Sequence, residues 1–221
     1  MVTILKDIPI PGIEVIPCRL HGPRGIVKAF LLHDAAGMVL VDTGFSEADA
    51  DLILERIARL GRPLTDLKLC ILTHRHRDHV GGLKKLRELG PFAVVSHEAE
   101  AAGIEQTCGV AVDRLVRDGD ELPEMGGIRI IHLPGHTPGS IGLYLHQARA
   151  LLAGDAIFSA GEWLVVSPAY LSEDPAQARE SVRRLLGLGL AIDHLLVAHG
   201  DDVYRTAQDP LSHILAERRV F

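Results

Sequence analysis

The sequence predicts an α/β fold in which two sheets are covered by helices on their outer faces. Strand-like and helix-like segments alternate along the chain, and 47% of the 221 residues are hydrophobic, enough for a substantial core. No internal repeat, low-complexity tract or linker interrupts this order. We therefore expect residues 1–221 to form a single domain.

The first third of the chain predicts a sheet followed by a helix. Ser46, with Asp49 three residues later, resembles a capping box at a helix start. The apolar period that follows predicts an amphipathic helix over 47–60, which Gly61 ends. Turn signals separate short apolar runs, which predict strands at 13–16, 26–32 and 38–41.

Strands and helices then alternate. The spacing of Val80, Leu83 and Leu86 predicts a helix that Gly90-Pro91 ends. The mixed segment 104–126 predicts no particular element. Further strands are predicted at 67–72, 92–95, 128–133, 140–145, 150–153 and 195–198. Further helices are predicted at 98–103, from Asp174-Pro175 and from Asp209-Pro210.

Composition excludes several classes of protein. A formal net charge of −6 argues against nucleic acid as a partner. Cys18, Cys70 and Cys108 are odd in number and widely spaced, which indicates free thiols in a reducing compartment. Lys6, Asp7 and Pro9 interrupt the first apolar run before a signal peptide could form, and no segment reaches transmembrane length. These features predict a cytoplasmic protein that does not enter membranes.

Candidate metal ligands lie where predicted strands end. His74, His76, Asp78 and His79 fall within six consecutive positions, and imidazole and carboxylate are ligands that Zn²⁺ prefers. Other apolar strands also run into residues able to bind a metal. Because active sites often lie where loops leave a sheet, we expect these residues to converge. They are Asp42, His136, Asp155 and His199.

The same residues make the chain resemble the metallo-β-lactamase superfamily. The HxHxDH motif of that family is matched at residues 74–79, and its Gly-His-Thr-Pro-Gly segment at residues 135–139. The later Gly-Asp and His-Gly pairs are matched by Gly154-Asp155 and His199-Gly200. The resemblance covers most of the chain and implies the αββα sandwich of that family, two mixed sheets flanked by helices.

The resemblance also implies a role for each ligand. His74, His76 and His136 would hold one metal; Asp78, His79 and His199 would hold a second, and Asp155 would bridge the two. Asp42 would support a ligand without binding metal itself. The implied cofactors are two divalent metal ions, with Zn²⁺ favoured and Fe or Mn as alternatives.

A site of this kind implies hydrolysis. Two cations lower the pKa of a bridging water towards about 7, so that hydroxide is available as a nucleophile at neutral pH. Asp78, or Asp155 after the bridge opens, would transfer the proton to the leaving group. We expect a small-molecule substrate with a thioester, lactone or other activated ester. The alternatives are an iron enzyme of the same fold that acts on dioxygen or sulfur species, and a phosphodiesterase.

Departures from related subfamilies narrow the substrate. Asp155 stands where true β-lactamases usually have Cys or Ser, and Phe158 stands where lactonases of this fold have Tyr. The Gly-Cys-Gly-Arg segment of glyoxalase II enzymes is replaced by Ala160-Gly161-Glu162-Trp163, and only 22 residues follow His199. These departures argue against β-lactams and glutathione thioesters. The sequence is compatible with either a monomer or a homo-oligomer.

The remaining candidates have less specific interpretations. Phe158, Trp163 and Tyr170 are candidate substrate-pocket residues because aromatic side chains are scarce and these follow the bridging aspartate. His97 follows a strand, but no ligand position is left for it. We interpret Cys70 as a buried apolar residue. Arg75 and Arg77 flank the ligands, and we expect them to be solvated or paired with carboxylates.

Overall fold

Each half of the chain builds its own sheet. The structure, a computed structural model, describes residues 10–19, 25–160 and 163–216. The chain divides into a first unit, Ile10–Val116, and a second unit that includes the residues from Arg117 onwards. The single domain over 1–221 stays a prediction. Residues 1–9, from which we argued against a signal peptide, lie outside the described residues.

The first unit is built on a six-stranded mixed sheet in the order β1-β2-β3-β4-β5-β6. The first three strands pair antiparallel, and β3 to β6 pair parallel. Parallel neighbours need crossover connections, which helices supply here. The strands are β1 (Ile13–Arg19), β2 (Ile26–His33), β3 (Met38–Val41), β4 (Leu67–Ile71), β5 (Ala93–His97) and β6 (Arg114–Val116).

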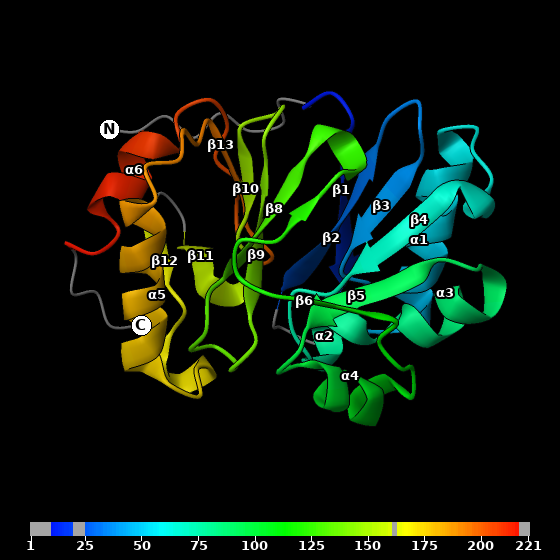
Figure 1. The fold of residues 1–221 in the computed structure, drawn as a ribbon, viewed down its shortest axis with the longest axis horizontal. Coiled ribbons are helices and arrows are strands. Elements are labelled where there is room, and N and C mark those ends of the chain that lie inside the picture. Colours follow the sequence, from blue (N-terminus) through cyan, green and yellow to red (C-terminus); the bar gives the residue numbers. More distant parts are fainter. Residues whose placement is uncertain (1–9, 20–24, 161–162, 217–221) are drawn as a thin grey trace. The chain divides into compact units, whose positions relative to one another are not determined.

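The helices of the first unit pack in two pairs. Helix α1 lies beside α3, and α2 lies beside α4 (Figure 1). As the sequence predicted, α1 begins with a capping box, in which the Asp49 carboxylate accepts the Ser46 N–H at 3.0 Å. The helices are α1 (Glu47–Arg59), η1 (Leu64–Asp66), α2 (Arg77–Val80), α3 (Leu83–Leu89) and α4 (Ala101–Cys108).

The predicted helix through Val80 and Leu86 is divided into α2 and α3. The break falls at Gly81-Gly82, where the backbone packs against the loop that follows β3. A Cβ on Gly81 would lie 1.9 Å from the Phe45 carbonyl oxygen, and the Gly81 N–H donates to the Gly44 carbonyl at 2.8 Å. Tertiary packing therefore overrides the helical period here and fixes α2, which carries part of the HxHxDH motif.

The second unit is built on a five-stranded mixed sheet in the order β13-β10-β9-β8-β7, together with the β11–β12 hairpin. Among the described strands of this unit, only β10 and β13 pair parallel. The strands are β7 (Glu121–Leu122), β8 (Ile128–His132), β9 (Ile141–Leu145), β10 (Ala150–Leu152), β11 (Ile157–Ala160), β12 (Trp163–Val166) and β13 (His194–Leu196). The helices are η2 (Glu124–Gly126), η3 (Gly154–Ala156), η4 (Ala169–Leu171), α5 (Pro175–Gly187) and α6 (Gln208–His213).

Helices α5 and α6 cover the β11–β12 hairpin (Figure 1). The Asp174 carboxylate accepts the Gln177 N–H at 2.9 Å and caps α5, as predicted. Buried Val182 and Leu185 of α5 share one apolar core with Leu211 of α6. This core supports the loops that leave the second sheet.

The predicted fold class, an α/β protein with two mixed sheets flanked by helices, is confirmed. Some elements differ from the prediction. The helix expected from residue 98 begins at Ala101, after a turn in which the Glu100 N–H donates to the His97 carbonyl. The sequence missed β6, β7, β11 and β12. Within the described ranges, no helix combines the length and hydropathy needed to span a membrane.

Candidate functional site

The HxHxDH cluster, defined as His74, His76, Asp78 and His79, lies in the first unit just after β4. His76 precedes the first residue of α2, and Asp78 and His79 belong to that helix. The turn of α2 brings ring nitrogens and carboxylate together. His74 Nε2 lies 3.1 Å from His76 Nδ1, and His79 Nε2 lies 3.9 Å from Asp78 Oδ2.

Asp42, which directly follows β3, holds this cluster in place through hydrogen bonds. Its side chain is 1% exposed and its backbone has a φ of 60°, a conformation that Asp and Asn tolerate better than most residues. Its carboxylate accepts the Thr73 N–H and the Thr73 hydroxyl, both at 2.8 Å, and lies 2.7 Å from His79 Nδ1. One buried carboxylate therefore fixes the start of the motif and one of its rings.

This hydrogen-bond pattern assigns the protons on two rings. An ionised carboxylate can only accept, so the Thr73 hydroxyl and His79 Nδ1–H both donate to Asp42. Since the Thr73 hydroxyl hydrogen is then used, its oxygen accepts from His74 Nδ1, 3.1 Å away. Both rings thus carry hydrogen on Nδ1, which leaves the Nε2 lone pairs for a metal.

The Asp155 cluster, defined as His136, Asp155 and His199, lies in the second unit. Each residue comes from a different connection: His136 follows β8, Asp155 is in η3 after β10, and His199 follows β13. Asp155 Oδ2 lies 3.4 Å from His136 Nε2 and 3.4 Å from His199 Nε2. Three strand ends therefore bring two imidazoles to one carboxylate oxygen.

Hydroxyl groups support the Nδ1 side of the His136 ring. Its Nδ1 lies 3.1 Å from Ser167 Oγ, and Ser172 Oγ lies 2.9 Å from that same oxygen. The loop that carries His136 is tied to the start of α5. The His136 carbonyl accepts the Glu173 N–H at 3.2 Å, and the Ser181 hydroxyl donates to the Pro134 carbonyl at 2.7 Å. Backbone and ring are thus held by separate contacts.

An aromatic face supports His199. The Phe158 ring of β11 stacks on the His199 ring, with centroids 5.2 Å apart and an interplanar angle of 7°. The Ser159 N–H donates to the His199 carbonyl at 3.1 Å, and the buried Asp202 carboxylate accepts the Val197 N–H at 2.9 Å. Ring and loop are therefore both fixed against neighbouring strands.

The donor atoms of both clusters suit a divalent cation. Two ligands about 2.0–2.1 Å from a tetrahedral Zn²⁺ lie about 3.3 Å from each other. The His74–His76, His136–Asp155 and His199–Asp155 pairs, at 3.1, 3.4 and 3.4 Å, have this spacing. Imidazole and carboxylate are also the donor types that bind such cations. Spacing and chemistry therefore agree.

Comparison with known proteins identifies the family. Residues 22–199 match the sequence model described as the metallo-beta-lactamase superfamily. The chain belongs to this superfamily. The match includes all the residues of both clusters, and membership implies divalent metal ions as cofactors.

Curated relatives carry a more specific name. Hydroxyacylglutathione hydrolase GloC of Haemophilus influenzae is 29% identical over 165 residues, which cover 68% of this chain and 74% of that protein. A hydroxyacylglutathione hydrolase of Rhodopseudomonas palustris is 34% identical over 134 residues, or 60% of this chain and 48% of that protein. The match with the latter thus spans about half of its length.

A solved structure supports the fold. A metallo-beta-lactamase family protein from Thermus thermophilus aligns with a TM-score of 0.75 and 26% identity. The alignment covers 93% of this chain and 79% of that one. The metallo-β-lactamase fold expected from the sequence is therefore confirmed.

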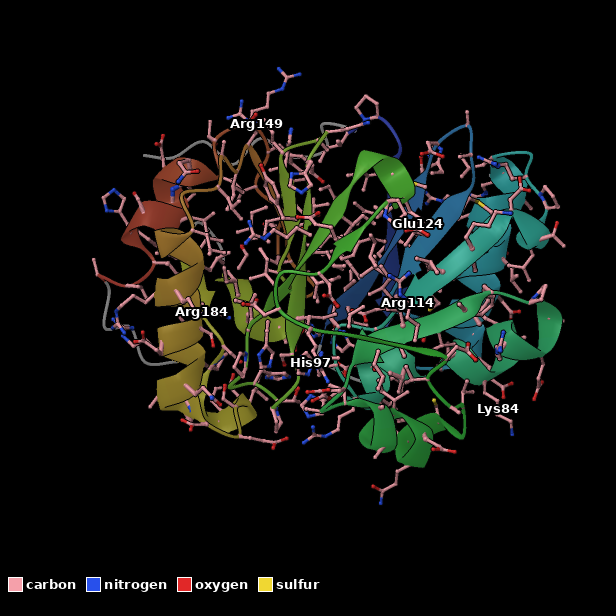
Figure 2. All side chains as sticks on the ribbon, in the orientation of Figure 1. Lys84, His97, Arg114, Glu124, Arg149 and Arg184 are labelled. Carbon is pink, nitrogen blue, oxygen red and sulfur yellow. The ribbon has the colours of Figure 1, made fainter. Side chains whose placement is uncertain are left out.

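The other candidate residues of this metallo-β-lactamase superfamily member vary in exposure. Trp163 at the start of β12 is 45% exposed and Tyr170 in η4 is 72% exposed, so both are available to a ligand. His97 ends β5 (Figure 2), and its Nδ1 accepts the Ala99 N–H at 3.2 Å. Burial raises the pKa of the Cys70 thiol well above its ordinary value, which argues against a thiolate nucleophile.

The two arginines of the motif have different partners. Arg75 pairs with the Glu100 carboxylate at 2.9 Å, as expected for an arginine near a carboxylate. The Arg77 guanidinium lies over the Phe45 ring, 5.3 Å from its centroid.

Sequence reasoning missed three residues that support the candidate ligands. Thr73 directly precedes His74, and Ser167 directly follows β12, so both positions adjoin elements that carry the site. Several ligand candidates were found because they follow predicted strands. Ser167 also follows a strand, but β12 was not predicted, so Ser167 was overlooked. Nothing local in the sequence marks Ser172.

Proposed function

We propose that this protein is a metal-dependent hydrolase that cleaves acyl thioesters. The observation that carries the proposal is the arrangement of each cluster: ligand-type atoms at the spacing of a coordination shell, with the opposite ring nitrogens of His74, His79 and His136 next to oxygen atoms. Such outer hydrogen bonds orient metal-bound histidines. Membership of the superfamily and the names of the relatives support the same class of reaction.

The proposed ligand sets follow the family pattern. One cation would be held by His74, His76 and His136, and the other by Asp78, His79 and His199. Asp155 would contribute to both. When bound, the two cations supply a Lewis acid for the substrate carbonyl and hydroxide at neutral pH.

The chain's own groups then have defined tasks. Asp42 keeps the His79 proton on Nδ1, and Thr73 does the same for His74, so that each Nε2 keeps its lone pair. The carboxylates of Asp78 and Asp155 are the candidate proton carriers to the leaving group. A thiolate leaves readily without a strong acid beside it, and Phe158, which has no hydroxyl, suits such a leaving group.

Two observations bear on the thiol that carries the acyl group. The relatives' name indicates glutathione, whereas the chain lacks the Gly-Cys-Gly-Arg segment expected of glyoxalase II enzymes. Trp163 and Tyr170 offer exposed aromatic surface, and together with Phe158 they are the proposed pocket residues. Flat aromatic faces bind apolar acyl or carrier groups well.

Metal analysis combined with a substrate panel tests the proposal. Protein purified without added metal should contain close to two equivalents of divalent cation and hydrolyse S-lactoylglutathione or an acyl thioester of a different thiol. Matched oxygen esters and lactones should be slower, and a chelator should abolish turnover. Iron with oxygen consumption and no hydrolysis would refute the proposal, as would full activity of the Asp78→Ala variant.

A further inference from the structure

Arg75 separates the two closest histidines of the HxHxDH cluster, and Glu100 holds it at two points. The Glu100 carboxylate accepts the Arg75 backbone N–H at 2.8 Å through Oε2 and the Arg75 guanidinium at 2.9 Å through Oε1. Each oxygen thus has a separate donor from the same residue. This bonding constrains both the backbone and the side-chain direction of Arg75.

Because Glu100 is buried, its carboxylate needs hydrogen-bond donors from the protein. Its side chain is 0% exposed, whereas that of Arg75 is 26% exposed. A carboxylate removed from water is costly unless charged or strong hydrogen-bond donors replace the water. The Arg75 backbone and guanidinium are two such donors. The buried carboxylate therefore favours one position of residue 75 over others.

Helix α4 is shaped to receive the arginine. Glu100 immediately precedes α4, and the Ile104 N–H donates to its carbonyl at 2.9 Å, which fixes it to the first turn. The Arg75 stem crosses the helix at Gly103, where an added Cβ would lie 2.3 Å from Arg75 Cδ. A larger residue at position 103 would occupy the path of the arginine.

We propose that Glu100 is a positioning residue that sets the spacing of the two ligand nitrogens of His74 and His76 through Arg75. The proposal rests on the proposed metal-binding function. His74 Nε2 and His76 Nδ1 lie 3.1 Å apart across the residue that Glu100 holds. Fixing Arg75 restrains the backbone that joins these histidines, so a cation meets a pair whose relative position is already limited.

The test is cobalt binding to metal-free, full-length protein. Co²⁺ reports the number and geometry of its ligands through its visible d–d absorption, and competition with a chromogenic chelator gives its affinity. Glu100→Gln keeps the side-chain shape but presents an amide N–H₂ group to one of the Arg75 donors. We expect about tenfold weaker Co²⁺ binding and an altered d–d band.

Two further variants separate positioning from general damage. Gly103→Ala keeps every charged group but displaces the Arg75 stem, and it should change the Co²⁺ spectrum in the same direction as Glu100→Gln. Glu105→Gln makes the same chemical change at an exposed position of α4 and should leave affinity and spectrum unchanged.

The outcomes distinguish the two levels of the proposal. A folded Glu100→Gln variant with wild-type Co²⁺ affinity and spectrum would overturn the positioning role, even if its melting temperature fell. If Glu100→Gln does not fold, an unchanged Gly103→Ala spectrum overturns it instead. Wild-type protein that binds neither Co²⁺ nor Zn²⁺ would refute the proposed function and, with it, this inference.

Discussion

The HxHxDH cluster and the Asp155 cluster support their histidines with different chemistry. In the first, the buried carboxylate of Asp42 holds His79 directly and His74 through Thr73. In the second, His136 lies against the hydroxyl of Ser167 and His199 against the Phe158 ring. Hydrogen bonds to a charged group are roughly twice as strong as those between neutral groups. The first cluster should therefore be the more rigid.

The clusters also differ in how their ligands are gathered. Four ligand candidates of the first come from six consecutive residues, so a single loop and helix start place them. Those of the second come from three separate connections. Displacement of one loop in the second cluster moves one ligand, whereas displacement of α2 moves several ligands of the first. This contrast gives an order of expected mutational effects.

The largest effect is expected for Asp42→Asn. Asparagine keeps the side-chain shape and tolerates the positive φ. It removes the negative charge, however, and its N–H₂ group cannot accept the hydrogen bonds that Thr73 and His79 donate. Because three buried hydrogen bonds are disturbed, the free energy of unfolding of the metal-free protein should fall by about 3 kcal/mol. Urea denaturation measures this change.

Asp34→Asn is the matched control in the same unit. Asp34 is exposed and accepts the Ala36 and Gly37 N–H groups in a turn, a role that asparagine can fill. Its unfolding free energy should stay within about 0.5 kcal/mol of wild type. Equal losses from both variants would show that Asp42 is no more than an ordinary turn residue.

A smaller effect on stability is expected for Ser167→Ala. Loss of a neutral hydrogen bond to His136 costs about 1 kcal/mol of unfolding free energy. Zn²⁺ affinity should still fall about tenfold, because the ring loses the partner that orients it. Calorimetric titration of the metal-free protein measures the affinity, with Ser172→Ala as a milder neighbour. A loss of stability as large as that of Asp42→Asn would contradict the proposed difference between the clusters.

The same contrast explains what the sequence could predict. The ligand candidates are adjacent in sequence or follow strong apolar strands, so their positions could be found without contacts. The support of His136 by Ser167 joins residues 31 positions apart, across β11 and β12, which are four residues each and carry no clear period. The division of α2 from α3 likewise depends on contact between Gly81 and Phe45, which no local pattern contains.

The smallest effect is expected at Asp118, outside both clusters. Arg184, which extends from α5 (Figure 2), lies 2.7 Å from the Asp118 carboxylate, and the His132 N–H donates to the same carboxylate at 2.8 Å. These contacts join α5 to the end of β8, which leads to His136. Burial raises the pKa of Asp118, but the two donors outweigh it and leave the pKa below its ordinary value of 3.8.

This shift fixes the sign of a pH dependence. Since the pKa of Asp118 is lower in the folded protein, its stabilising contribution is complete above the ordinary value and is lost as pH falls through the folded value. Asp118→Asn should therefore be slightly less stable than wild type near neutral pH, and the two should converge in acid. Urea denaturation between about pH 7 and pH 3 measures the difference.

Salt dependence gives a second test. Added salt should shrink the stability difference between wild type and Asp118→Asn, because the Asp118–Arg184 pair is exposed. It should leave the stability loss of Asp42→Asn unchanged. Equal salt sensitivity at both positions would contradict the distinction between the buried Asp42 carboxylate of the first unit and the exposed Asp118 carboxylate of the second.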